Sequence, residues 1–333
     1  MRGGTNKVPQ IFGDGSDGAV IVNSNTTWSA ETEDTGMIVK NFETLIIPNE
    51  VTVSAGNRNC GMIIRVQGDC TIAGTLANKL SCKTLLSSDN VDFSSWPLTM
   101  LSGKAGDGGT GGKGLYNDAT TPAAGMTGRF YGGGWSGGGA SRNHAGGSSN
   151  NITTATEMFV GGLGAQNGSF GGGAGGRAGA PGFNNLNTRG GNGPGENGSA
   201  FSSQESLYTY YSAGGAGNIG GGVILLFVGG NLTITGSLDC SGNKGGNGGT
   251  NAGGGNGSFC GSGGGGSGGG RIFICYKGTF SNAGTLNVSG GVGGAVGKWI
   301  GLDNHNNGYP GAAGGDGTTA IKTYDQYKEE DVA

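Results

Sequence analysis

The stretch Gly222–Gly242 reads GVILLFVGGNLTITGSLDCSG, and Gly270–Gly290 reads GRIFICYKGTFSNAGTLNVSG. The two stretches align without a gap from Gly222 on Gly270 to Gly242 on Gly290. In each, apolar residues two apart are followed by a glycine, a second alternating pair, another glycine and a short last pair. Because the side chains of a strand alternate between its faces, we expect Ile224, Leu226 and Val228 to share one face. The repeat predicts short strands with glycine at the corners.

Two earlier copies extend the same pattern toward the N-terminus. Met62–Leu76 aligns without a gap on Ile224–Leu238, and Ile38–Gly56 is a looser copy. In that looser copy, the alternating apolar residues are Leu45, Ile47, Val51 and Val53. We therefore expect a mainly β protein with almost no α-helix, whose rungs of short strands form a β-solenoid or a sandwich.

Glycine accounts for 82 of the 333 residues and is sorted with a period of three between the rungs. In residues 103–114, glycine fills one of the three registers and, apart from Ala105, a second, while the third holds Lys104, Asp107, Thr110 and Lys113. Residues 171–182 and 290–297 are sorted in the same way, and Gly263–Gly270 contains seven glycines and one serine. Polyproline II has three residues per turn, and faces without Cβ let neighbouring strands exchange main-chain hydrogen bonds. We predict a glycine-rich polyproline II bundle, with Gly263–Gly270 in its interior, rather than flexible linkers.

These patterns divide the chain into four regions. We expect residues 1–80 to be an N-terminal β region and residues 81–221 to be the polyproline II bundle with variable loops. Residues 222–317 carry the β-rung repeats with glycine-rich excursions, and residues 318–333 are a C-terminal tail.

Charge and hydropathy argue against several classes of protein. The net charge is −3 and no basic run occurs, so nucleic-acid binding has little electrostatic support. The longest apolar run, Val223–Val228, is too short to cross a bilayer, and we expect no membrane insertion. Met1 is not followed by an apolar segment, so we expect no secretory signal peptide.

The cysteines predict neither a zinc site nor a disulfide framework, because none of them forms a C-x-x-C pair. We expect them to act mainly as small buried hydrophobic residues that stay thiols in a reducing cytoplasm. The six are Cys60, Cys70, Cys82, Cys240, Cys260 and Cys275.

Four stretches of varied residues interrupt the glycine tracts: Leu115–Thr127, Ala140–Val160, Phe183–Ser212 and Lys298–Pro310. A polyproline II bundle offers almost no side-chain surface, so recognition would fall to such loops, where aromatic rings give rigid contact area. The candidate receptor-contact residues are Tyr116, Trp135, His144, Phe183, Tyr208, Tyr210, Tyr211, Trp299, His305 and Tyr309. The alternative is that these side chains only cover the flanks of the bundle.

Catalytic signals are few. Neither His144 nor His305 has a partner at metal-ligand spacing. The carboxylates of Asp107, Asp239 and Asp316 are isolated in the sequence. We expect no enzyme activity, no cofactor and no metal, although folding can still bring two carboxyl groups together as a glycosidase requires.

The segment Phe12–Ala19 (FGDGSDGA), followed by the strand-like Val20–Val22, resembles the start of bacteriophage tail-fibre and tail-tip proteins. The copy at Ile63–Leu76 resembles them as well, and the glycine tracts with variable loops resemble the glycine-rich adhesins at the tips of T-even-type phage long tail fibres. The resemblance implies a non-enzymatic virion protein, made in the host cytoplasm, whose loops contact a glycan or outer protein of the bacterial surface. It further implies a homotrimer, other virion tail proteins as partners, and a role in attachment or as a shaft for the N-terminal β region, residues 1–80. The chain departs from those adhesins by carrying its own β-rungs.

Two other functions stay open at this stage. A β-solenoid polysaccharide depolymerase would need a clustered pair of acidic residues in a groove. An ice-binding protein would need a flat array of threonine or small residues, whereas the outward positions of the glycine tracts include Lys104, Asp107, Lys113 and Arg177.

Overall fold

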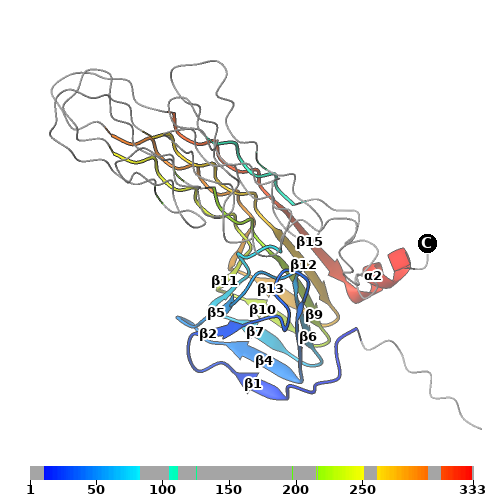
Figure 1. Cartoon of the computed structure of the whole chain (residues 1–333). Coiled ribbons are helices and arrows are strands. Elements are labelled where there is room, and N and C mark those ends of the chain that lie inside the picture. The colour runs from blue at the N-terminus through cyan, green and yellow to red at the C-terminus, as the bar shows by residue number, and fades with distance from the viewer. Residues whose placement is uncertain are drawn as a thin grey trace, which may run out of the picture.

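The computed structural model describes residues 11–82, 105–111, 125, 197, 215, 217–250, 261–298 and 309–331, with side chains as far as residue 328. The strands form five successive turns of the chain, which we call rungs (Figure 1). Rung 1 consists of β1 (Ala19–Ile21), β2 (Thr26–Trp28) and β3 (Ile38–Phe42), and rung 2 of β4 (Thr44–Ile47), β5 (Thr52–Ala55) and β6 (Met62–Val66). Rung 3 consists of β7 (Cys70–Ile72), β8 (Thr75–Ala77) and β9 (Val223–Val228), and rung 4 of β10 (Leu232–Ile234), β11 (Ser237–Asp239) and β12 (Arg271–Tyr276). Rung 5 consists of β13 (Phe280–Asn282), β14 (Thr285–Asn287) and β15 (Thr318–Thr323).

Each rung contributes one strand to each of three five-stranded sheets. Sheet A has the order β1-β4-β7-β10-β13, sheet B the order β2-β5-β8-β11-β14, and sheet C the order β3-β6-β9-β12-β15. Every pairing between neighbouring strands is parallel. Parallel sheets stacked as rungs are the arrangement of a β-solenoid, not of a sandwich, and the mainly β prediction is confirmed. Among the described residues, the one helix is α2 (Tyr324–Asp331).

The alignment of the sequence repeats is also the register of the sheets. Leu232 pairs with Phe280, and Cys70 pairs with Leu232, which are the residues that the gap-free alignments match. Equivalent positions of the repeat therefore stack on one another, as Leu76, Leu238 and Leu286 do in sheet B. Stacking of this kind keeps every apolar position on the same side of its sheet.

The inward side chains form one continuous hydrophobic core along the rungs. Ile224, Leu226 and Val228 are buried in it together, as the alternation predicts. Burying each such side chain contributes about 1.5–3 kcal/mol. At rung 5 the core becomes less apolar, because Asn282 aligns with Ile234 and Thr319 aligns with Ile272.

The outer face of sheet C carries a second hydrophobic cluster. Val223, Leu225 and Phe273 point away from the main core and are nevertheless buried. Part of the cover comes from α2, which follows β15 directly, and whose Tyr327 ring lies 6.3 Å from the ring of Phe273. The N-terminal segment adds Phe12, which also packs against this cluster.

The three long insertions of the chain leave the solenoid at one corner, in the connection from sheet B to sheet C. Residues 78–222, 240–270 and 288–317 make this connection in rungs 3, 4 and 5, whereas 29–37 and 56–61 suffice in rungs 1 and 2. The described parts of the long insertions run away from the strands as extended traces (Figure 1). We call these parts the legs, namely 105–111, 217–222, 240–250, 261–270, 288–298 and 309–317.

The legs bind one another through main-chain hydrogen bonds whose donors recur every third residue. Between legs 240–250 and 288–298, the bonds run from Gly242 N to Ser289 O, Gly245 N to Val292 O and Gly248 N to Ala295 O. Between legs 288–298 and 261–270, they run from Gly291 N to Ser267 O, Gly294 N to Gly264 O and Gly297 N to Gly261 O. Each leg thus contributes hydrogen-bond donors at a spacing of three rather than the spacing of two seen in strands.

Exposure follows the same period, as the sequence predicts. All residues of leg 261–270 are buried, including the predicted interior segment Gly263–Gly270. Asp107 and Thr110 are exposed, while Gly106 and Gly109 are buried. Residues 171–182, and with them Arg177, lie outside the described residues, as do Lys104 and Lys113.

At the C-terminal end of the chain, the last strand of sheet C lies within the region predicted to be a tail. Thr318–Thr323, which that outline assigns to the tail, form β15 and pair along their whole length with β12. Most of region 81–221 lies outside the described residues.

Candidate functional site

Of the ten candidate receptor-contact residues, the structure describes Tyr309. Its side chain is exposed, with a relative accessibility of 52%. Its main-chain N–H donates a hydrogen bond of 3.2 Å to Ser262 Oγ, and its carbonyl accepts one of 3.0 Å from Gly263 N. The backbone of Tyr309 is thus held by leg 261–270 while its ring remains accessible.

The other nine candidates lie outside the described residues. They are Tyr116, Trp135, His144, Phe183, Tyr208, Tyr210, Tyr211, Trp299 and His305. Lys298 and Pro310, the first and last residues of the stretch that contains Tyr309, are both exposed.

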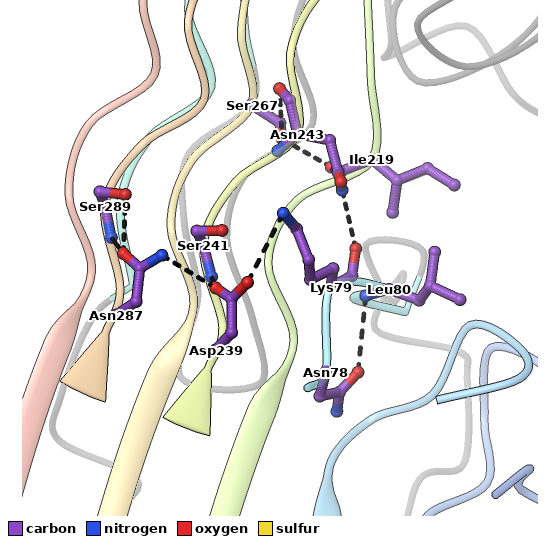
Figure 2. A network of polar contacts seen from close by, with 10 residues as sticks. All are labelled: Asn78, Lys79, Leu80, Ile219, Asp239, Ser241, Asn243, Ser267, Asn287 and Ser289. Carbon is purple, nitrogen blue, oxygen red and sulfur yellow. Dashed lines mark hydrogen bonds and ion pairs between the residues drawn. The ribbon is translucent and has the colours of Figure 1, made fainter. Parts of the chain in front are cut away.

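A network of polar contacts lies at the junction, which we define as the residues where the legs join sheet B: Asn78, Lys79, Asp239, Ser241, Asn243, Ser267, Asn287 and Ser289 (Figure 2). Asp239 and Asn287 end the equivalent strands β11 and β14. Asp239 Oδ1 accepts hydrogen bonds from Ser241 N at 2.9 Å and from Asn287 Nδ2 at 3.1 Å. Lys79 Nζ lies 3.8 Å from Asp239 Oδ2 on the other side. One carboxylate therefore links rungs 3, 4 and 5 where their insertions begin.

Asn243 ties three legs to one another. Its Nδ2 donates hydrogen bonds of 2.8 Å to the carbonyls of Lys79 and Ile219 (Figure 2). Its main-chain N donates at 2.7 Å to Ser267 Oγ, whose hydroxyl donates in turn to Ile219 O. The first and last segments of the insertions of rungs 3 and 4 are thereby joined to one another close to the strands.

Asn78 occupies the fully buried side of the junction. Its Nδ2 donates hydrogen bonds of 2.9 Å to Asn59 Oδ1 and to Val223 O, and its Oδ1 accepts one of 3.2 Å from Asn59 Nδ2. Both asparagine residues have zero exposure. Buried amides satisfied in this way fix the chain direction, because an unpaired buried polar group is costly.

A buried ion pair supports the corner next to the junction. Arg58 Nε and Nη2 donate to the two carboxylate oxygens of Asp34 at 2.8 Å and 2.7 Å, and Glu33 lies 3.1 Å from Nη1. Burial alone would lower the pKa of Arg58, but its bonds to Asp34 and the charge of Glu33 outweigh this effect and raise it. Asp34 adopts a positive φ of 68°, so the pair holds a bent loop in place.

The polar side chains of the junction contact one another and join the rungs to the legs. Amides, hydroxyls and one ion pair make up the junction, and burial together with the charge of Asp239 raises the pKa of the neighbouring Cys240 thiol, which keeps it protonated. Within the described ranges, no group of three or more His, Cys, Asp or Glu side chains is placed to hold a metal ion. The described residues contain no helix that is long and apolar enough to cross a membrane.

The junction was not among the candidates of the sequence analysis, although the repeat carries a signal for it. The segments LDCSG at 238–242 and LNVSG at 286–290 place Asp239 opposite Asn287 and Ser241 opposite Ser289. A polar residue that recurs at the end of equivalent strands indicates a stacked polar row. Asn243 and Asn78 carry no such signal, because the repeat has Gly291 and Cys240 at the equivalent positions, so no polar residue recurs there.

Of the six cysteines, five are described, and all five are buried free thiols. This agrees with the prediction that they act as small hydrophobic residues. Cys260 lies outside the described residues.

Comparison with protein-family models, with curated proteins and with solved structures found no match to this chain.

Proposed function

We propose that this protein is a non-enzymatic phage virion component, a tail fibre or receptor-binding adhesin whose variable loops contact a receptor on the bacterial surface. The observation that carries the proposal is the construction of the legs. Their buried glycines bond to neighbouring legs through the main chain, which leaves little side-chain surface along the legs for recognition. Binding then falls to the loops that join the legs.

The legs are polyproline II strands in this proposal. Three observations support the assignment: donors spaced by three residues, glycine at the buried positions, and side chains such as Asp107 and Val292 on the remaining face. Polyproline II strands have three residues per turn and rise about 3.1 Å per residue. A bundle of them is a stiff spacer, because each strand is hydrogen-bonded along its length.

The geometry of the solenoid suits the display of such loops. The insertions of rungs 3, 4 and 5 leave from one corner, and their described legs run away from the strands on the same side of the solenoid (Figure 1). Tyr309 lies nine residues before β15, which corresponds to roughly 28 Å along a polyproline II strand. An exposed aromatic ring at that distance from the solenoid is well placed for contact with a glycan or protein.

The proposal includes partners that the resemblance implies. The solenoid would attach to other virion tail proteins, and the chain would assemble as a homotrimer. The receptor would be a surface glycan or an outer protein of the host, and the net charge of −3 favours neither over the other. Nucleic acid is not proposed as a partner, because no basic run supplies phosphate contacts.

A cell-binding experiment tests this function. Fluorescently labelled full-length protein is applied to a panel of bacterial strains that differ in surface glycans and outer proteins. We expect saturable binding to particular strains, and a tenfold or greater loss for Tyr309→Ala combined with Trp299→Ala. The control Ile21→Ser, on the exposed outer face of sheet A, should bind as the wild type does. Equal binding by all variants, or binding to no strain, would contradict the proposal.

The same preparation separates adhesion from depolymerisation. Spotted on lawns of capsulated cells, the protein should produce no halo if it only binds. A halo that spreads beyond the spot would identify a polysaccharide depolymerase. Electron microscopy of phage particles labelled with an antibody against the chain should then place it on the tail.

One observation favours an ice-binding function as a second candidate. On the outer face of sheet B, the register stacks Thr52, Thr75, Ser237 and Thr285 at one position of successive rungs. This is the array of small hydroxyl residues whose absence from the glycine tracts argued against ice binding. Thermal hysteresis of the purified protein tests it directly: a freezing point lowered below the melting point would support it, and coincident temperatures would remove it.

A further inference from the structure

Two buried cysteines lie close together at the corner of the solenoid where the long insertion of rung 3 begins. Cys60 precedes β6, and Cys82 follows β8 on the way into the long insertion. Their side chains have exposures of 0% and 3% and belong to the same hydrophobic cluster on the outer side of sheet C.

Backbone contacts place the two residues next to each other. Asn59 and Ser81 form an isolated parallel bridge, and Cys82 N donates a hydrogen bond of 2.9 Å to Asn59 O. Cys60 and Cys82 each follow a bridged residue by one position, so they are the next pair in register and their side chains leave on the same side. Neighbouring strands lie about 4.7–4.9 Å apart, within the range of Cα separations, about 4.4–6.8 Å, found in disulfides.

We propose that Cys60 and Cys82 are a latent disulfide pair, a site of reversible oxidation that covalently ties the start of the long insertion to rung 2. The bond would close a loop that contains β6, β7 and β8. Cys82 would then be anchored to rung 2 by a covalent link as well as by its hydrogen bond to Asn59. The proposal is independent of the receptor-binding function.

The oxidant is a small-molecule disulfide such as oxidised glutathione. One cysteine loses its proton, and its thiolate attacks a sulfur of the oxidant and releases one glutathione thiolate, which takes up a proton. The thiolate of the second cysteine then attacks the protein sulfur of this mixed disulfide and releases the second glutathione. Two protein thiols are oxidised, and one oxidised glutathione is reduced to two molecules of the thiol.

The environment of the pair makes the reaction slow and dependent on pH. Burial, together with the adjacent Cys60 thiol, raises the pKa of Cys82 well above its usual value. Because the thiolate is the attacking species, its scarcity at neutral pH limits the rate. Where attack by the Cys82 thiolate limits the reaction, the rate of disulfide formation should therefore rise about tenfold per pH unit over the range in which that thiol is still protonated.

The test is thiol counting and peptide mapping on the full-length protein. Native protein is incubated with oxidised glutathione at mildly alkaline pH, then denatured, alkylated and digested without reductant. We expect two of the six thiols to be lost, the peptides of Cys60 and Cys82 to be linked, and reductant to restore both thiols. The thermal unfolding temperature should rise on oxidation.

Matched variants locate the site. Cys60→Ala and Cys82→Ala should each lose at most one thiol, as a glutathione adduct, and yield no linked peptides. Cys240→Ala, which removes another buried cysteine, should still lose two. Six free thiols in the oxidised wild type, a different linked pair, or glutathione adducts alone would overturn the proposal. Peptide mapping of the wild type decides the question even if a variant fails to fold.

Discussion

The side-chain amide of Asn78 donates a hydrogen bond of 2.9 Å to the carbonyl of Val223, a residue 145 positions later in the sequence. The carbonyl of Asn78 accepts a further bond of 2.8 Å from Gly222 N. The longest insertion of the chain therefore begins and ends at the same point of the solenoid. Rung 3 is continuous in space although its strands β8 and β9 are distant in sequence.

Asn78→Leu should destabilise the protein markedly. The variant removes the hydrogen bonds that Val223 O and Asn59 Oδ1 accept from the buried Asn78 amide, and each such loss costs about 1–3 kcal/mol. We expect a decrease of roughly 2–5 kcal/mol in the free energy of unfolding, measured by urea denaturation followed by circular dichroism. Lys244→Ala, which truncates an exposed side chain, should change it by less than about 0.5 kcal/mol. Equal stability of both variants would show that the Asn78 network is dispensable.

Gly294→Ala should disrupt the packing of the legs. A methyl group at Gly294 would collide with the main-chain carbonyl of Gly246, which no side-chain movement can relieve. Overpacking of this kind costs about 1–3 kcal/mol and more where backbone must move. Amide hydrogen exchange should then accelerate in legs 240–250 and 288–298 while the strands remain protected. Val292→Ala, on the exposed side of the same leg, is the control and should exchange as the wild type does.

Arg58→Met should lower the free energy of unfolding by about 3–5 kcal/mol, because it removes the positive charge and the two hydrogen bonds that Arg58 supplies to the buried carboxylate of Asp34. Adding Asp34→Asn removes the uncompensated charge and keeps a residue type that tolerates a positive φ. The double variant should therefore be more stable than Arg58→Met alone. A double variant that is less stable by the sum of both single effects would exclude coupling between the two charges.

Stability should fall at high pH because of the buried thiols. Burial raises the pKa of Cys70 to about 12 from an ordinary value of 9.0, so between these values the unfolded chain releases a proton that the folded chain retains. Below pH 9.0 the contribution of this thiol to the free energy of unfolding is fully present. Between pH 9.0 and about 12 that contribution falls by about 1.4 kcal/mol per pH unit. Urea denaturation at several pH values above 9 measures the slope. Cys70→Ala should have a shallower slope, and an unchanged slope would assign the effect to other groups.

The repeats alone predicted the strands from β3 to β14, but they left a solenoid and a sandwich both open and did not extend to β2 or β15. The residues that the gap-free alignments match are the residues that pair between β10 and β13 and between β7 and β10. Alternation at Ile224, Leu226 and Val228 identified the inward face correctly, because period-two patterning is a local property of the chain. The period-three sorting of glycine likewise anticipated which residues of leg 105–111 are buried and which are exposed.

Apart from the Asp239–Asn287 pair, the polar contacts between side chains of different rungs could not be predicted from such patterns. Nothing local indicates that Asn78 pairs with Asn59 and Val223, that Arg58 is matched to Asp34, or that Cys60 lies beside Cys82. These partners meet only because parallel stacking returns the chain to the same corner once in every rung, whatever the length of the insertion between. Strand, face and register depend on side chains close together in the sequence, whereas the junction depends on where five turns of backbone come to lie over one another.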